Sequence, residues 1–128
     1  MPFIYSIIIS TNTPVLSLPQ LKGQQLTCYD KPMNIGIPKE IKNQEHRVSM
    51  IPASVKDLVK RGHTVYVQQG AGAGASYTDE QYIACGAIIL DTTEEVFAQS
   101  TLIVKVKEPQ ASEVAMLTDQ HILFTYLH

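Results

Sequence analysis

The hydrophobic residues of this chain fall into short runs that alternate with segments of helical periodicity. Each run is rich in β-branched residues and is the length of a buried strand. Between the runs, apolar residues recur every three or four positions, as on one face of a helix. The expected strands are 34–37, 64–68, 87–90, 102–106 and 122–126.

Start and stop signals mark the helices that connect these strands. The segment 52–62 has proline at its first helical position and glycine just past its end. Two more helices are predicted to begin at capping boxes, where a threonine is followed three residues later by Gln or Glu. These pairs are Thr78 with Gln81 and Thr92 with Glu95, and a last helical turn is expected around 112–117.

Strands that alternate with helices over short links predict right-handed βαβ units around a parallel sheet. The expected fold class is therefore α/β, a three-layer domain of the Rossmann-like or flavodoxin-like type. We expect residues 33–128 to form this domain.

Residues 1–32 follow a different pattern. An apolar run at 3–9 precedes a stretch rich in Ser, Thr, Pro and Gln that has neither helical nor strand periodicity. A secretory signal would need a basic n-region, which is absent here. A membrane span would need roughly 20 apolar residues, and this run offers about half of that or less. We expect an N-terminal extension that is disordered or translated from upstream, with Met33 as the natural first residue.

Composition and charge narrow the class of function. The chain has 128 residues, 45% hydrophobic and 17% charged, which is ordinary for one globular domain. A formal net charge of -2 provides no field to recruit nucleic acid or an anionic membrane. Cys28 and Cys85 lie far apart, without the spacing of a disulfide framework or a zinc site. No metal site is expected, and the cysteine usage favours the cytoplasm.

Three glycines, Gly70, Gly72 and Gly74, follow the expected strand 64–68. A dinucleotide fingerprint has the spacing G-x-G-x-x-G and leads directly into a helix. Here the spacing is G-x-G-x-G and the next helix begins only at Thr78, with no P-loop lysine. The pattern favours a tight loop that needs positive φ values, and a nucleotide cradle remains the alternative.

Three side chains with useful chemistry follow the ends of expected strands: Arg47, Lys107 and His128. Ligands of open parallel sheets collect at the carboxyl ends of the strands. Arginine can bind a carboxylate with two parallel hydrogen bonds, lysine can polarise a carbonyl oxygen, and histidine can transfer a proton. Together they would suit a small 2-oxo or 2-amino acid. Each could equally be a surface residue, with Lys107 paired to Glu108.

Four separated motifs occur in order along the chain: "MNIGIPKEIKNQEHRVSMIPASV" (33–55), "GAGAGASYTDEQYIACGA" (70–87), "LIVKVKEP" (102–109) and "LFTYLH" (123–128). They resemble the N-terminal part of bacterial alanine dehydrogenase, and the resemblance covers essentially all of residues 33–128. The α subunit of the proton-translocating NAD(P) transhydrogenase shares the opening pattern and the glycine loop, but typically departs at the last two motifs.

The resemblance implies NAD-dependent oxidative deamination of L-alanine to pyruvate and ammonia. Arg47 and Lys107 match the substrate-binding residues of that family, and His128 matches its general acid/base. The glycine loop would belong to the substrate domain. NAD would be bound by a domain absent from these residues, so no cofactor-binding residue is expected here.

The resemblance also bears on the state of the chain. It implies a truncated, incomplete substrate domain that is inactive alone, from a family whose full-length dehydrogenases form hexamers. Two alternatives stay open: the N-terminal domain of a transhydrogenase α subunit, and a non-catalytic module that binds a partner.

Overall fold

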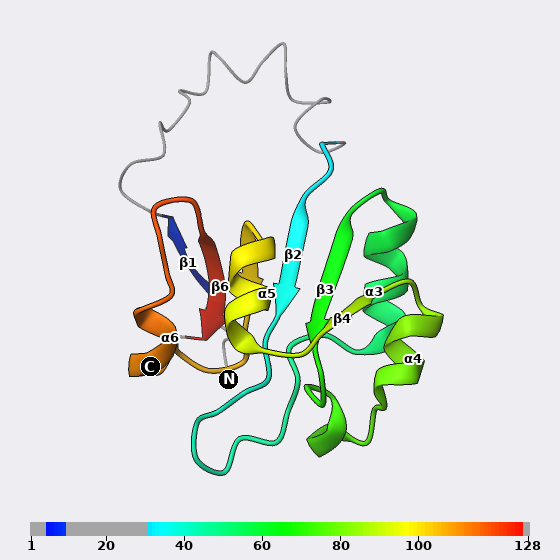
Figure 1. Ribbon diagram of the computed structural model, residues 1–128, viewed down its shortest axis with the longest axis horizontal. Helices are drawn as coiled ribbons and strands as arrows, with labels where there is room; N and C mark the ends of the chain where they lie inside the picture. The colour runs from blue at the N-terminus through cyan, green and yellow to red at the C-terminus, as the bar shows by residue number, and fades with distance from the viewer. Residues whose placement is uncertain (1–4, 10–30, 127–128) are drawn as a thin grey trace.

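The computed structural model describes residues 5–9 and 31–126 of the chain. They form a six-stranded sheet with helices on both faces (Figure 1). This arrangement confirms the predicted α/β fold. In chain order the elements are β1 (Tyr5–Ile9), β2 (Asn34–Ile37), α3 (Pro52–Lys60), β3 (Thr64–Gln68), the 3₁₀ turn η1 (Ala73–Ala75), α4 (Asp79–Ala84), β4 (Ile88–Leu90), α5 (Thr93–Gln99), β5 (Leu102–Val104), α6 (Ala111–Val114) and β6 (Ile122–Tyr126).

The strands lie in the order β1-β6-β5-β2-β3-β4, and all from β2 to β6 are parallel. The chain runs outward from β2 to β4, then crosses back to β5 on the other side of β2. The direction of winding therefore reverses between β2 and β5, which is where open α/β sheets form a ligand crevice. The arrowheads of β2, β3 and β6 point downward in Figure 1, so the carboxyl ends of the parallel strands lie at the lower edge.

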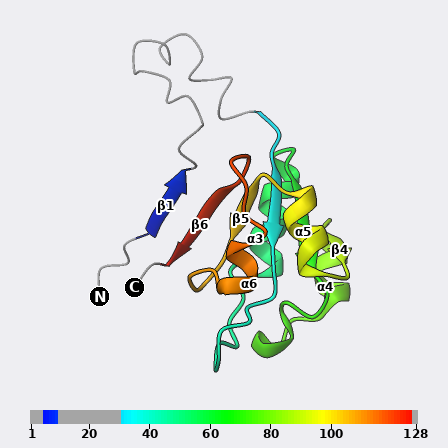
Figure 2. The ribbon, with the colours of Figure 1, turned by 60° about the vertical axis from the view of Figure 1, so that its left-hand side comes forward.

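β1 comes from the segment that was expected to be an extension without structure. It runs antiparallel to β6, with Tyr5 opposite Tyr126 and Ile9 opposite Ile122 (Figure 2). The sequence pattern did not predict this pairing, because the partner strand lies at the other end of the chain. Residues 10–30 lie outside the described residues, and the boundary at Met33 remains a prediction.

Two faces of the sheet are covered by different helices. On one face, β2 and β3 pack their buried residues against α3 and α4. On the other, α5 lies directly over Gly36, where an added Cβ would be 2.9 Å from Val96 Cγ1. Since successive strand residues point to opposite faces, the result is the predicted three-layer arrangement. The main core comprises Ile35, Ile37, Val55, Val65, Val67, Ala71, Tyr82, Ala87 and Val104.

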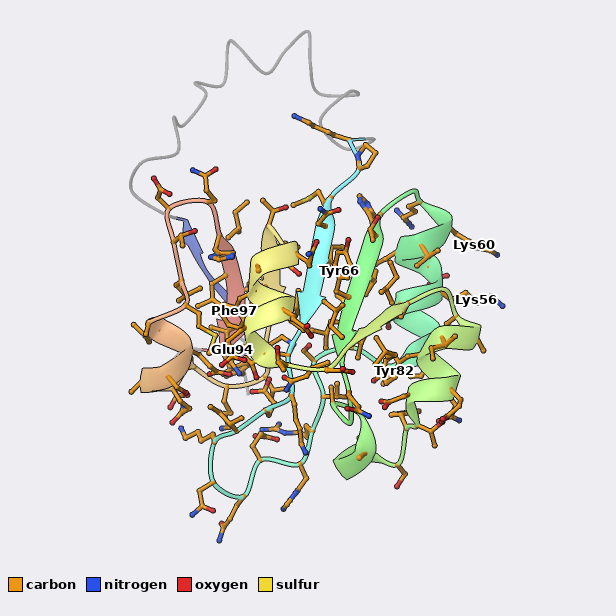
Figure 3. The ribbon with its side chains drawn as sticks, viewed as in Figure 1. Lys56, Lys60, Tyr66, Tyr82, Glu94 and Phe97 are labelled. Carbon is orange, nitrogen blue, oxygen red and sulfur yellow. The ribbon has the colours of Figure 1, made fainter. Side chains whose placement is uncertain are left out.

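The helices begin and end where their sequence signals lie. At α4, the Gln81 amide donates to Thr78 Oγ1 (3.3 Å), and the Thr78 amide donates to Gln81 Oε1 (2.8 Å). The same reciprocal pair forms between Thr92 and Glu95 at α5. Lys56 and Lys60 project away from the sheet (Figure 3), as the amphipathic pattern of α3 requires. Both capping boxes are therefore confirmed.

Candidate functional site

A cavity of about 390 Å³ lies at the carboxyl ends of β5 and β6. Its remaining walls come from the segment after β2, residues 38–51, which we call the Arg47 loop, and from the glycine loop. The cavity therefore adjoins the point where the winding of the sheet reverses. Its lining residues are Arg47, Val48, Ser49, Ile51, Ala75, Val104, Lys105, Val106, Phe124 and Tyr126.

Arg47 lies at this cavity in a paired state. Its Nε donates to Glu45 Oε1 and its Nη2 to Glu45 Oε2, both at 2.8 Å, while its amide donates to Oε1 at 3.0 Å. The hydrogen bonds from Arg47 lower the pKa of Glu45 to about 2, and the charge of Lys107 contributes. The same pairing raises the pKa of Arg47.

The two partners differ in their contact with solvent. The Arg47 side chain is 67% exposed, whereas that of Glu45 is 6% exposed. A guanidinium group has five N–H donors, and Glu45 receives two of them. Glu45 therefore fixes one edge of the guanidinium, and the other edge can receive a second carboxylate.

Lys107 is half-buried and follows β5. Its amide donates to Glu40 Oε1 at 3.0 Å, and its carbonyl accepts from Thr125 Oγ1 at 2.7 Å. Its ammonium is close enough to Glu45 to lower the pKa of that carboxyl group. The structure thus brings Arg47 and Lys107 to the same end of the sheet.

His128 lies outside the described residues, so its predicted role remains a prediction. The described part of β6 ends at Tyr126, which lines the cavity. His128 follows Tyr126 by two positions in the sequence.

Sequence reasoning missed a buried charged cluster beside Lys107. Lys105 Nζ donates to Glu40 Oε1 (3.2 Å) and to Glu113 Oε1 (3.0 Å), and all three side chains are at most 1% exposed. We call these three residues the Lys105 cluster. The sequence signal for this cluster was Lys105 itself, which continues the apolar run 102–104. A lysine buried in this way needs oppositely charged partners.

The cluster also explains why β5 is shorter than predicted. The expected strand was 102–106, but β5 ends at Val104. The carboxylate of Glu40 accepts the amides of Val106 (3.1 Å) and Lys107, which a longer strand would use for pairing.

The glycine loop is a tight structural loop, as its spacing favoured. Positive φ explains only one of its three glycines, and close packing explains the other two. Only Gly70 of the three has positive φ, at 73°, and its amide donates to Asp79 Oδ1 (2.9 Å). A Cβ on Gly74 would lie 2.5 Å from the carbonyl oxygen of His46, and one on Gly72 would lie 2.7 Å from Tyr82 Cε2. The loop therefore packs against the Arg47 loop.

Within residues 5–9 and 31–126, no three His, Cys, Asp or Glu side chains gather closely enough to hold a metal ion. No helix there has the length and hydrophobicity to span a bilayer. Cys85, at the end of α4, is a free thiol.

Comparison with known proteins adds independent evidence. The family model described as "Alanine dehydrogenase/PNT, N-terminal domain" matches residues 36–128. The chain is 54% identical over 96 residues to alanine dehydrogenase of Methanococcus maripaludis, and 48% identical over 96 residues to that of Mycobacterium tuberculosis. Each match covers 75% of this chain and 26% of the relative, so the chain spans about a quarter of their length.

Solved structures give the same picture. An L-alanine dehydrogenase superposes with a TM-score of 0.73 at 45% identity, covering 75% of this chain and 26% of that one. The transhydrogenase from Sinorhizobium meliloti superposes with a TM-score of 0.64 at 31% identity, covering 69% of this chain and 26% of that one.

Proposed function

We propose a function from the premise that this chain belongs to the alanine dehydrogenase/PNT N-terminal domain family. It supplies the substrate side of an alanine dehydrogenase, which converts L-alanine to pyruvate and ammonia with NAD. One observation supports the proposal: Arg47 lines a cavity at the carboxyl ends of the parallel strands that is large enough for a small acid, and Lys107 is close enough to act on Glu45, the partner of Arg47. Two cations at this position suit a carboxylate with an adjacent carbonyl oxygen.

Arg47 binds the substrate carboxylate. Because Glu45 already receives two of its donors, the carboxylate binds at the other edge of the guanidinium. The hydrogen bonds from Arg47 lower the pKa of Glu45 to about 2, which reflects a well-formed pair. We therefore expect Glu45 to stay on Arg47 while the substrate binds.

Lys107 donates to the carbonyl oxygen of pyruvate and stabilises negative charge that develops there when ammonia adds. His128 transfers the proton as the carbinolamine forms and collapses. This assignment rests on the family resemblance and on its place two residues after Tyr126.

NAD supplies the hydride acceptor in this reaction, and the described glycine loop does not fit it. The space that a Cβ would take at Gly72 and Gly74 is filled by Tyr82 and by the His46 carbonyl, so packing within the domain accounts for these two glycines, whose spacing is not that of a dinucleotide fingerprint. We infer that other parts of the full-length enzyme bind NAD. We further propose that the 128-residue chain alone is inactive, and hexameric assembly and a cytoplasmic location remain predictions.

A transhydrogenase domain is the second candidate, and the similarities favour it less. Identity to the superposed transhydrogenase is 31%, against 45% to the dehydrogenase.

Pyruvate binding tests the proposal directly. Titration of the ¹⁵N-labelled chain should shift the amides of the Arg47 loop and of Lys107. Arg47→Met should weaken affinity at least ten-fold, because a hydrogen bond to a charged group contributes about 1.5–3 kcal/mol and about 1.4 kcal/mol is ten-fold in Kd. Arg61→Met is the matched control, since Arg61 is exposed at the end of α3, away from the cavity. Equal effects of the two substitutions would contradict the assignment.

The inactivity of the chain needs a separate assay. Purified chain, L-alanine and NAD should give no NADH absorbance above the background of a Lys107→Ala variant. NADH formation that disappears in that variant would overturn this part of the proposal.

A further inference from the structure

The backbone of Lys107 is fixed on both sides by buried side chains. Its N–H donates to Glu40 Oε1 at 3.0 Å, and its carbonyl accepts from Thr125 Oγ1 at 2.7 Å. The Glu40 side chain is 1% exposed, and Thr125 is 0% exposed. Glu40 lies just after β2, whereas Thr125 lies in β6. Side chains from the segment after β2 and from β6, which flank β5, therefore both hydrogen-bond to the backbone of Lys107.

Glu40 is itself fixed by the rest of the Lys105 cluster. Lys105 Nζ bridges Glu40 and Glu113 at 3.2 and 3.0 Å. The second oxygen of Glu113 accepts the Gln110 amide at 2.8 Å. The segment from Lys105 to Gln110 is thus anchored near both ends by hydrogen bonds to buried carboxylates.

This arrangement is more than strand termination requires. Water could satisfy the amides at a strand end, and buried ion pairs often add less stability than apolar residues of similar volume. What buried carboxylates supply is direction, because each oxygen accepts hydrogen bonds along a defined line. Here the two oxygens of Glu40 set the amides of Val106 and Lys107.

We propose that Glu40 and Thr125 are positioning residues for Lys107, and that Lys105 and Glu113 hold Glu40 in place. Neither positioning residue needs to touch the substrate. They set the backbone from which the Lys107 side chain reaches the carbonyl oxygen. This inference rests on the proposed function, in which Lys107 binds that oxygen.

Thr125→Val removes the hydroxyl donor and keeps the shape of the side chain. Pyruvate affinity should fall roughly five-fold, the scale of one neutral hydrogen bond. Thr125→Ser keeps the hydroxyl and should retain the affinity. Thr93→Val is the matched control, since it removes the hydrogen bond from Thr93 Oγ1 to Gln68 Oε1 (3.1 Å), outside the cavity.

A double-mutant cycle shows whether Thr125 acts through Lys107. In a Lys107→Met background, Thr125→Val should have no further effect on pyruvate affinity. The same five-fold loss in both backgrounds would overturn the proposal, because it would mean that Thr125 acts on the fold in general. A loss of affinity in Thr93→Val equal to that in Thr125→Val would overturn it too.

Hydrogen exchange separates this inference from the proposed function. The Lys107 amide should exchange at least several-fold faster in Thr125→Val than in Thr93→Val, whether or not pyruvate binds. If the unmodified chain does not bind pyruvate but this difference appears, the positioning holds and the proposed ligand is wrong. If the Lys107 amide exchanges equally in the two variants, the positioning itself is wrong.

Discussion

The Lys105 cluster and the Arg47–Glu45 pair use the same chemistry in opposite surroundings. In the cluster, one ammonium and two carboxylates are all at most 1% exposed. In the pair, the carboxylate is 6% exposed but the guanidinium is 67% exposed. The cluster fixes backbone amides, whereas the pair leaves part of its cation open to solvent.

This difference in exposure distinguishes charged groups that support the backbone from charged groups that can bind a ligand. A fully buried group of charges cannot bind a ligand without breaking its own hydrogen bonds, so its effect is on geometry. A half-exposed pair retains free donors at the cavity while its buried partner limits the motion of the cation. Stability should therefore depend mainly on the cluster, and ligand affinity mainly on the pair.

The largest expected effect comes from removing the central charge of the cluster. Lys105→Met leaves two buried carboxylates without a cation, which should lower the free energy of unfolding by about 3–5 kcal/mol. Urea denaturation followed by circular dichroism measures this. Lys56→Met, on the exposed side of α3, is the control and should change stability by less than about 0.5 kcal/mol. Similar losses in both variants would remove the distinction between cluster and surface.

A smaller effect is expected where the glycine loop supports the Arg47 loop. Gly74→Ala would place a Cβ 2.5 Å from the His46 carbonyl oxygen, so one backbone segment has to move. We expect a loss of about 1–3 kcal/mol together with shifted amide signals around Arg47. Gly62→Ala is the contrast, because its φ of 92° makes it strained while no atom lies within 4 Å. Gly62→Ala should lower stability without moving those signals. Shifts of the same size in both variants would contradict a specific supporting contact between the glycine loop and the Arg47 loop.

The smallest effect concerns Glu45 and pH. Its pKa is about 2 in the folded chain against an ordinary value of 4.5. The stabilisation is fully present above pH 4.5 and is lost as the pH falls toward 2. Glu45→Gln should flatten that part of the stability profile, by no more than about 1 kcal/mol because the cation of the pair is largely exposed to solvent. Urea midpoints at several pH values between 3 and 7 measure this, and parallel profiles for the two proteins would exclude the assignment.

Local signals in the sequence predicted the local structure well. Thr78 and Thr92 cap α4 and α5 as their spacing requires, because a capping box involves only one helical turn. Arg47 and Lys107 were predicted to lie near each other because parallel strands place their carboxyl ends at one edge, and their binding roles remain predictions. The resemblance to a known family added their roles, which the pattern alone could not supply.

What the pattern missed depends on residues far apart in the chain. Lys105 is buried because Glu40 and Glu113 reach it from the β2 loop and from α6, and no periodicity shows such a meeting. β1 was missed because its partner β6 is distant in sequence. In both cases the structure depends on tertiary contacts, which the local sequence pattern does not show.

The antiparallel strand β1 has a consequence for the solubility of the chain. Unpaired edges of a sheet are templates for other strands and lead to self-association. β1 occupies the outer edge of β6 over five residue pairs, and the opposite edge is formed by β4, which is only three residues long. β1 is itself five residues long and mostly apolar, so it replaces the edge of β6 with another edge of the same length. The first strand of the chain is therefore the edge at which backbone pairing with other chains is expected.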